Sequence, residues 1–320
     1  MQALRNSGTP EATGPLHLTR QFLDPDEAAG AIPGTRLEIS VLGPAQGPWS
    51  ITELQGEGCR LVSGRTASPF SACGEIARDS MLVCWPMSDD TGAWSVNGRG
   101  IQRATLLHFD TGAEYASLTR RPLNWAALVF PAAQREALAD FTAIDLPHEA
   151  MARIRGLTRT AIYLARADEA PTSRVFLANL ASTVGHWTSR LAREAPRRAG
   201  IGVGALVDLL HSRRAELLHA SDLARMAGLD ERQLRREFSA FFGISVGRYL
   251  RVRRLNDVRR ELANPMSHIE SVTQAATKHG FYDLGRFAAN YRRTFGENPS
   301  ATLSRTRRAM RLARLRDPVH

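Results

Sequence analysis

One pattern occurs twice between Ser221 and Ser300, and this repeat constrains the fold more than any other feature of the sequence. The copies begin 52 residues apart and end 53 residues apart. An approximate repeat at one period identifies a supersecondary unit that is present twice. The first copy contains Ala224, Gly228-Leu229, Leu234, Phe238 and Phe242-Gly243, and the second contains Ala276, Gly280-Phe281, Phe287, Tyr291 and Phe295-Gly296.

Each copy is typical of two helices joined by a tight turn. In the first copy an apolar helical stripe ends at Gly228, and glycine often ends helices because it adopts the left-handed conformation easily. Asp230 is a good N-cap for a second helix, in which Leu234 and Phe238 lie four residues apart on one face. The pattern therefore predicts a helix-turn-helix unit.

The second copy predicts the same unit, with helices over residues 271–278 and 283–294 and a turn at Gly280. A long helix over residues 246–263 is expected to join the two units. The alternative is an ordinary helical bundle that contains two helical hairpins. Because both copies close with an aromatic residue, three further residues and Phe-Gly, we favour paired helix-turn-helix units.

This arrangement resembles the C-terminal DNA-binding domain of the AraC/XylS family of bacterial transcription regulators, over roughly the last hundred residues. Residues 254–262 and 280–287 further resemble the branch that includes the ethanolamine operon regulator. The resemblance implies an α+β protein with two domains. An N-terminal cupin-like β-barrel sensor domain would precede a C-terminal all-α domain with two helix-turn-helix units.

The net positive charge of the chain lies in the C-terminal part, which contains the repeat. Residues 201–320 contain 22 Lys and Arg against 12 Asp and Glu, whereas residues 1–200 contain 20 of each class. The whole formal net charge of +10 therefore lies beside the repeat. A basic module next to a neutral one indicates binding to nucleic acid.

The N-terminal half is expected to be an all-β domain preceded by a flexible arm over residues 1–35. Many short strands, broken by turn signals such as Asn97-Gly98, are typical of a small antiparallel barrel or jelly roll. This agrees with the cupin-like domain that the resemblance implies. Alternating or apolar runs predict strands over residues 36–42, 50–54, 59–63, 81–85, 104–109, 114–118 and 125–130.

Helices are predicted after these strands, over residues 132–141, 148–167 and 172–193. The third helix has apolar residues at heptad spacing, which fits two interpretations equally. The seam either pairs with the same helix of a second subunit in a homodimer, or packs on the barrel. Its residues are Leu177, Leu180, Val184, Trp187 and Leu191.

Composition and period divide the chain into further expected segments. The sensor domain is expected over residues 36–192, a linker over 193–204, the DNA-binding domain over 205–305 and a basic tail over 306–320. The arginines of the tail are expected to add nonspecific phosphate contacts.

In the first recognition helix, the outward face is expected to read bases. With Leu234 inside, Arg232, Arg235 and Arg236 point outward, and Glu231 lies beside them. Arginine binds guanine O6 and N7 with two hydrogen bonds. The three arginines also match base-contacting positions of the family that the chain resembles.

The second recognition helix is poorer in polar side chains. At the matching positions we expect Arg286 to contact a base or phosphate and Leu284 to contact a thymine methyl group. This unit should add less base specificity and depend more on backbone contacts from Arg292 and Arg293.

The N-terminal half shows no pattern of catalytic residues. His108 is the only histidine in its predicted strands, whereas cupin enzymes hold a metal with several histidines and a carboxylate. We therefore expect a non-enzyme with no metal and no cofactor. The three cysteines, Cys59, Cys73 and Cys84, are scattered and are expected to be reduced and buried.

We accordingly expect a cytoplasmic, sequence-specific transcription regulator that is controlled by a small-molecule effector in the N-terminal domain. The resemblance implies an activator with double-stranded DNA and RNA polymerase as partners, and no membrane segment is evident. Two alternatives stay open: a cupin-type metalloenzyme with an appended DNA-binding domain, and a regulator without effector.

Overall fold

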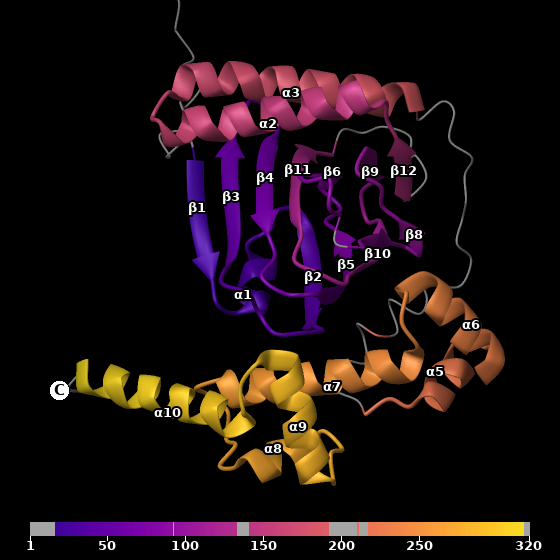
Figure 1. Ribbon diagram of the computed structural model, residues 1–320, viewed down its shortest axis with the longest axis vertical. Coiled ribbons are helices and arrows are strands. Elements are labelled where there is room, and N and C mark those ends of the chain that lie inside the picture. The colour runs from indigo at the N-terminus through magenta and orange to yellow at the C-terminus, as the bar shows by residue number, and fades with distance from the viewer. Residues whose placement is uncertain (1–16, 92, 133–140, 192–209, 211–216, 317–320) are drawn as a thin grey trace, which may run out of the picture.

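Figure 1 shows the computed structural model of the chain, which describes residues 17–91, 93–132, 141–191, 210 and 217–316. The N-terminal part contains strands and three helices, and the C-terminal part is helical. The strands are β1 His17–Phe22, β2 Thr35–Val41, β3 Trp49–Gln55, β4 Arg60–Arg65, β5 Phe70–Ile76, β6 Ser80–Pro86, β7 Ser95–Val96, β8 Arg99–Gly100, β9 Thr105–Phe109, β10 Glu114–Thr119, β11 Asn124–Pro131 and β12 Phe141–Asp145. The helices are α1 Pro25–Gly30, α2 His148–Arg166, α3 Ala170–Leu191, α5 Ala220–Met226, α6 Glu231–Phe242, α7 Val246–Ala263, α8 Val272–Lys278, α9 Leu284–Phe295 and α10 Pro299–Arg316.

The strands form two antiparallel sheets that pack face to face. The seven-stranded sheet has the order β1-β3-β4-β11-β6-β9-β12, and the five-stranded sheet has the order β2-β5-β10-β7-β8. In the described part of the chain, no strand pairing joins the two sheets, so they do not close into a barrel. The predicted α+β class, with a β-rich N-terminal domain and a helical C-terminal domain, is confirmed.

The molecule is layered from α2 and α3 through the two sheets to the C-terminal helices (Figure 1). Alternation along the strands explains the layers, because successive side chains point to opposite faces. In β6, Val83 and Trp85 pack under α2 and α3, whereas Leu82 and Cys84 face the five-stranded sheet. The outer face of the five-stranded sheet packs on the C-terminal domain, and Cys73 and Leu118 belong to that shared core.

The heptad seam of α3 packs inside the chain, as one of its two interpretations predicted. Leu177, Leu180 and Val184 are fully buried with the outer face of the seven-stranded sheet, and Trp187 is partly buried against the same core. These side chains are therefore not available for a homodimer through this seam. Leu191 ends α3, and its side chain lies outside the described residues.

The prediction of a flexible arm over residues 1–35 is wrong for residues 17–34. Residues 17–34 contain β1, which pairs with β3, and α1, whose N-cap Asp24 accepts a hydrogen bond from the backbone of Asp26. The strand was missed because it lies at the edge of its sheet and most of its side chains are exposed, so it lacks alternation.

The seven predicted strands are all present, as β2, β3, β4, β6, β9, β10 and β11. The predicted helices at 148–167 and 172–193 correspond to α2 and α3. The helix predicted over 132–141 lies mostly outside the described residues, and Phe141 is the first residue of a strand instead. The predicted linker over 193–204 is also outside the described part.

The C-terminal helices follow the repeat. The joining helix has the predicted bounds as α7, and the expected basic tail continues helix α10 as far as Arg316. Of the helices that the structure describes, none combines the length and apolar character needed to cross a bilayer.

Candidate nucleic-acid interface

Helices α5 and α6 form the first helix-turn-helix unit. Gly228 in the turn has φ +66°, a left-handed conformation that costs glycine nothing. Asp230 caps α6 by accepting a hydrogen bond from Gln233 N at 2.8 Å. Leu234 and Phe238 are fully buried, so the opposite face of α6 is left for a partner.

The predicted base-reading arginines of α6 are exposed, but they differ in their partners. Arg235 forms an ion pair with Glu231 at 2.6 Å, and Arg236 lies 3.7 Å from Glu237. Arg232 has no ion pair or hydrogen bond with any described side chain. The structure thus brings the four predicted residues of this helix together on one face and leaves one guanidinium uncommitted.

Helices α8 and α9 form the second unit, which also has a left-handed glycine in its turn and side-chain N-caps. Gly280 has φ +76°, and Asp283 caps α9 through a 2.9 Å hydrogen bond from Arg286 N. Ser271, predicted as the first residue of helix α8, is its N-cap and accepts a hydrogen bond from Gln274 N at 3.1 Å. Both recognition helices end at left-handed glycines, Gly243 and Gly296.

The exposed face of α9 is less polar than that of α6, as expected from the sequence. Leu284 is the first residue of α9 and is 38% exposed, and Arg286, two residues later, is also exposed. Arg292 and Arg293 are also exposed, and Arg293 donates a hydrogen bond to Asn290 Oδ1. The four predicted residues therefore lie on α9 where DNA could reach them.

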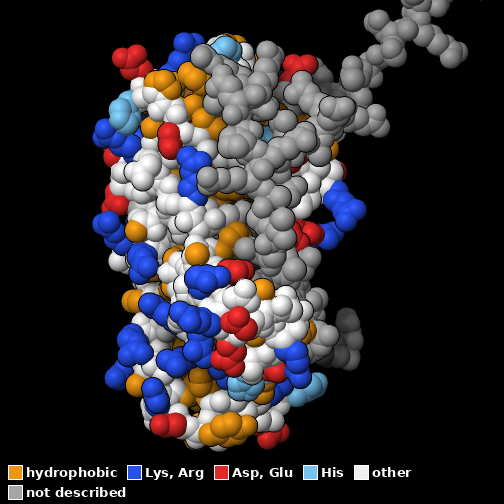
Figure 2. Space-filling view, turned by 90° about the vertical axis from the view of Figure 1, so that its right-hand side faces the viewer, with side chains coloured by type: hydrophobic (Ala, Val, Ile, Leu, Met, Phe, Trp, Pro, Cys, Tyr) orange, Lys and Arg blue, Asp and Glu red, His pale blue; other side chains and the backbone are white. Residues whose placement is uncertain are grey.

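Basic side chains gather over the part of the surface formed by the C-terminal helices (Figure 2). This distribution agrees with the uneven charge of the sequence. Phosphates of nucleic acid are attracted by such a surface at long range, independently of sequence. Two features of this surface were not predicted from the sequence: the arginines of α7 next to α9, and Tyr282, which is 81% exposed.

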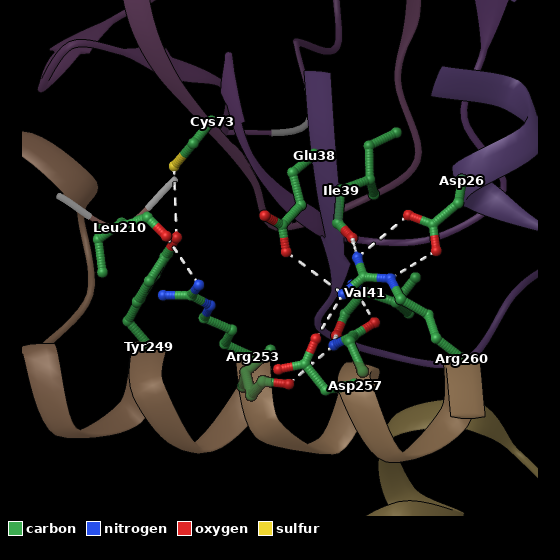
Figure 3. Close-up of polar contacts among 12 residues, drawn as sticks. Asp26, Glu38, Ile39, Val41, Cys73, Leu210, Tyr249, Arg253, Asp257 and Arg260 are labelled. Atoms are coloured by element: carbon green, nitrogen blue, oxygen red, sulfur yellow. Dashed lines mark hydrogen bonds and ion pairs between the residues drawn. The ribbon is translucent and has the colours of Figure 1, made fainter. Parts of the chain in front are cut away.

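Helix α7 is fixed to the sheet domain by a network around Arg260 (Figure 3). The guanidinium donates to both oxygens of Asp26, at 2.6 and 3.1 Å, and to Glu38 at 3.3 Å. It also donates to Asp257 at 2.9 Å and to the carbonyl of Ile39 at 2.7 Å. Burial opposes the charge of Arg260, but Asp26 and the other two carboxylates outweigh it, so the pKa of Arg260 is raised.

Two further contacts fix the same helix. Asn256 pairs with both backbone groups of Val41, accepting from N at 2.9 Å and donating to O at 3.2 Å. The hydroxyl of Tyr249 lies 3.4 Å from the sulfur of Cys73 (Figure 3). The helix that joins the two helix-turn-helix units is thus tied to β2, β5 and α1 of the other domain.

A small cavity lies between the two sheets, with a volume of about 90 Å³. Its lining is mainly apolar, and Leu37, Ile39 and Ala72 contribute to it from the five-stranded sheet. Arg65 and Ser117 are among its few polar lining residues. Such a composition is typical of small-molecule sites, which are apolar with a few polar groups.

His108 and the three cysteines of the sheet domain are buried. Burial lowers the pKa of His108, against the charge of Asp110, and the ring nitrogen Nε2 lies 3.2 Å from the sulfur of Met81. The predicted buried, reduced cysteines are confirmed, since all three are free and buried. Burial raises the pKa of Cys73 to about 12, so its thiol is protonated at neutral pH.

Comparison with known proteins agrees with this geometry. Residues 223–305 match the family model of a helix-turn-helix domain. The XylDLEGF operon transcriptional activator 2 of Pseudomonas putida is 46% identical over 82 residues, which cover 26% of this chain and 52% of that protein. The probable thc operon regulatory protein of Rhodococcus erythropolis is 31% identical over 134 residues, 42% of this chain and 40% of that protein.

The chain spans about half, or less, of the length of these curated relatives. Among solved structures, a probable AraC family transcriptional regulator from Rhodopseudomonas palustris is 28% identical and covers 33% of this chain and 96% of its own. The TM-score between the two structures is 0.30.

Proposed function

We propose that this chain, whose C-terminal domain is of the AraC/XylS family of transcription regulators, is a sequence-specific DNA-binding regulator that activates transcription together with RNA polymerase. The observation that supports it most is the pair of helix-turn-helix units on one helix, each with exposed arginines on its recognition helix. Such helices enter the major groove, and two on one rigid support would read neighbouring stretches of one duplex.

The proposed effector site is the cavity between the sheets. Three elements that line it also hold α7 from their opposite side: α1 through Asp26, β2 through Glu38 and β5 through Cys73. A molecule that moved these elements would change how α7 is held. In this proposal the effector therefore acts on the DNA-binding domain through α7.

The size of the cavity favours a second candidate, a regulator without effector. A cavity of about 150 Å³ holds one benzene molecule in an engineered protein, whereas this cavity measures about 90 Å³. An effector would have to be small or would have to part the sheets. No observation favours the metalloenzyme alternative, and no three His, Cys, Asp or Glu side chains of the described residues group as a metal site.

Transcription in vitro tests the proposal. The full chain and RNA polymerase would be added to a template that carries the chain's preferred duplex upstream of a promoter. Increased transcript is expected with the wild-type chain, and a strong reduction is expected with Arg232→Ala. A decrease of transcript on adding the wild-type chain would overturn the activator assignment.

The effector is tested by titrating candidate small molecules while the melting temperature of the full chain is measured. Ala72→Leu, which fills the cavity from β5, is the matched control. A ligand that stabilises the wild-type chain but not this variant supports the cavity site. Equal stabilisation of both would place the ligand elsewhere.

A further inference from the structure

A hollow of about 320 Å³ lies between α7 and the second helix-turn-helix unit. Three arginines from two helices line it, Arg251 and Arg254 of α7 and Arg286 of α9. Tyr282 and Asn290 lie at its other borders. The hollow thus joins the long helix to the start of the second recognition helix.

The three guanidiniums have no carboxylate partner among the residues that the structure describes. Arg254 donates from Nε to the carbonyl of Leu250 at 3.3 Å, and its guanidinium lies 5.9 Å from the ring centroid of Phe281. These contacts fix its position and leave its two terminal nitrogens available. The arginine is held in place without being neutralised.

Among the described residues that line the hollow, Asp283 is the single acid, and it already caps α9 by accepting from Arg286 N. Burial and the nearby charge of Arg251 both lower the pKa of Arg254, which agrees with an uncompensated positive site. An anion would relieve this repulsion. The planar fork of arginine suits phosphate in particular, because it donates two parallel hydrogen bonds.

The two copies of the repeat differ in length by one residue at the position of the hollow. In the first unit the turn glycine Gly228 is two residues before the N-cap Asp230, whereas in the second unit Gly280 is three residues before Asp283. This difference accounts for the change of period from 52 to 53, and the additional residue is Tyr282. The extra residue places an exposed aromatic hydroxyl at the edge of the hollow.

We propose that the hollow bounded by Arg251, Arg254, Tyr282 and Arg286 binds backbone phosphates of the DNA strand beside the groove that α9 enters. This inference rests on the proposed DNA-binding function. It explains how a recognition helix with Leu284, and few polar side chains, is fixed on its duplex, since phosphate contacts set register and orientation. The free phosphate group of a small molecule would have the same chemistry, and the experiment separates the two sources.

The test is a salt titration of the full chain on its preferred duplex and on a scrambled duplex. Arg251→Ala removes an exposed side chain and should leave the fold intact. We expect about tenfold weaker binding to both duplexes at one salt concentration. We also expect the slope of log K against log salt to become shallower by about 0.9 for each lost phosphate. Arg174→Ala, an exposed arginine of α3 at the far end of the molecule, is the control and should change neither quantity.

Other variants test the remaining members of the hollow. Tyr282→Ala should weaken binding to both duplexes, and Arg251→Lys should restore part of the lost affinity because it retains the charge. If the wild-type chain discriminates between the duplexes and Arg251→Ala binds both like the wild type, the hollow is not a phosphate site of DNA. If the wild-type chain itself binds the two duplexes with equal affinity, the proposed sequence-specific function is contradicted, and the variants then say nothing about the hollow.

Inorganic phosphate provides the second arm. The melting temperature of the full chain would be measured with phosphate and with chloride at equal ionic strength. We expect no specific stabilisation by phosphate alone. If phosphate raises the melting temperature of the wild-type chain but not of Arg251→Ala, while DNA binding of that variant is unchanged, the hollow serves a small phosphate-bearing ligand and the proposal is overturned.

Discussion

Arg232 differs from the other two arginines of α6 because no described side chain neutralises it. Arg235 must release or share Glu231 before it can bind a base, whereas Arg232 is available at once. We predict that Arg232→Ala weakens binding to the preferred duplex by about 1–3 kcal/mol and relaxes the preference at one base position. Competition binding against duplexes with single base changes measures both effects.

The matched control for this variant is Arg225→Ala. Arg225 is an exposed arginine of α5 in the same unit, and it is paired with Asp222 at 3.1 Å. It should change binding little. If Arg232→Ala retained the full base preference, Arg232 would be removed from the readout.

Arg260 is the residue on which the docking of α7 depends most. Its replacement by alanine would leave Asp26, Glu38 and Asp257 close together without a cation. Removing one partner from a mostly buried set of ion pairs lowers the free energy of unfolding by about 3 kcal/mol or more, because the remaining charges stay desolvated. We predict a loss of this order in the free energy of unfolding of Arg260→Ala, measured by urea denaturation.

Arg248→Ala provides the comparison on the same helix. Arg248 is exposed near the start of α7, and its side chain has no partner among the described residues. Its removal should alter the free energy of unfolding by less than about 0.5 kcal/mol. Similar values for both variants would show that the Arg260 network contributes little.

At the scale of elements, the helical domain could be predicted well and the sheet domain only in part. The repeat predicted α6, α7, α8 and α9 because their apolar stripes, caps and glycines agree with one another. Helix α5 begins at Ala220, one residue before Ser221, where the repeated stretch starts. Local signals were sufficient here because each unit is stabilised largely by its own contacts.

Strand β5 was missed for a physical reason. Almost all of its side chains are buried, because Ala72 lines the cavity on one face and Cys73 packs against the C-terminal domain on the other. A strand covered on both faces shows no alternation of polar and apolar residues. The docking of the two domains, which the sequence does not reveal, removed the signal.

The site residues, too, could be predicted from the sequence only in part. The arginines of α6 and α9 follow from helical geometry and were placed correctly on exposed faces. Arg251 and Arg254 were not singled out, because their role depends on how α7 packs against α9. Their spacing of three residues on one helix was the available signal.

The turn between β7 and β8 contacts helix α6 directly. A Cβ atom at Gly98 would lie 2.3 Å from the carbonyl oxygen of Ala240. We predict that Gly98→Ala destabilises the chain and weakens the contact between the domains, because neither backbone can move freely. Gly112→Ala is the matched control, since Gly112 has a similar φ of +70° against +75° and nothing within 4 Å.

Urea denaturation of both variants measures the difference. The left-handed backbone strain of about 1–2 kcal/mol is common to the two. The excess cost of Gly98→Ala, expected at about 1–3 kcal/mol, therefore reports the clash with α6. Equal costs for the two variants would show that this contact between the domains is absent in solution.

At the scale of the whole molecule, Cys73 reports whether the domains stay together. It is buried beneath α7, while Cys84 is buried inside the sheet domain. We predict that Arg260→Ala accelerates labelling of Cys73 by a thiol reagent without accelerating that of Cys84. Mass spectrometry of the two thiols in the same chain provides the internal control.

The outcome separates local opening from unfolding. Faster labelling of Cys73 alone means that α7 leaves the sheet while the sheet domain stays folded. Equal acceleration of both thiols would mean global unfolding, and no acceleration of either would show that the Arg260 network does not hold the interface.

Sequence-specific DNA binding is tested by the affinity of the full chain for a duplex selected from random sequences, compared with a scrambled duplex of equal length, as salt is raised. We expect tighter binding to the selected duplex at every salt concentration, because base contacts persist where phosphate contacts are screened. Failure to select any sequence, or equal affinities with the same salt dependence, would contradict the claim that the two helix-turn-helix units read a DNA sequence.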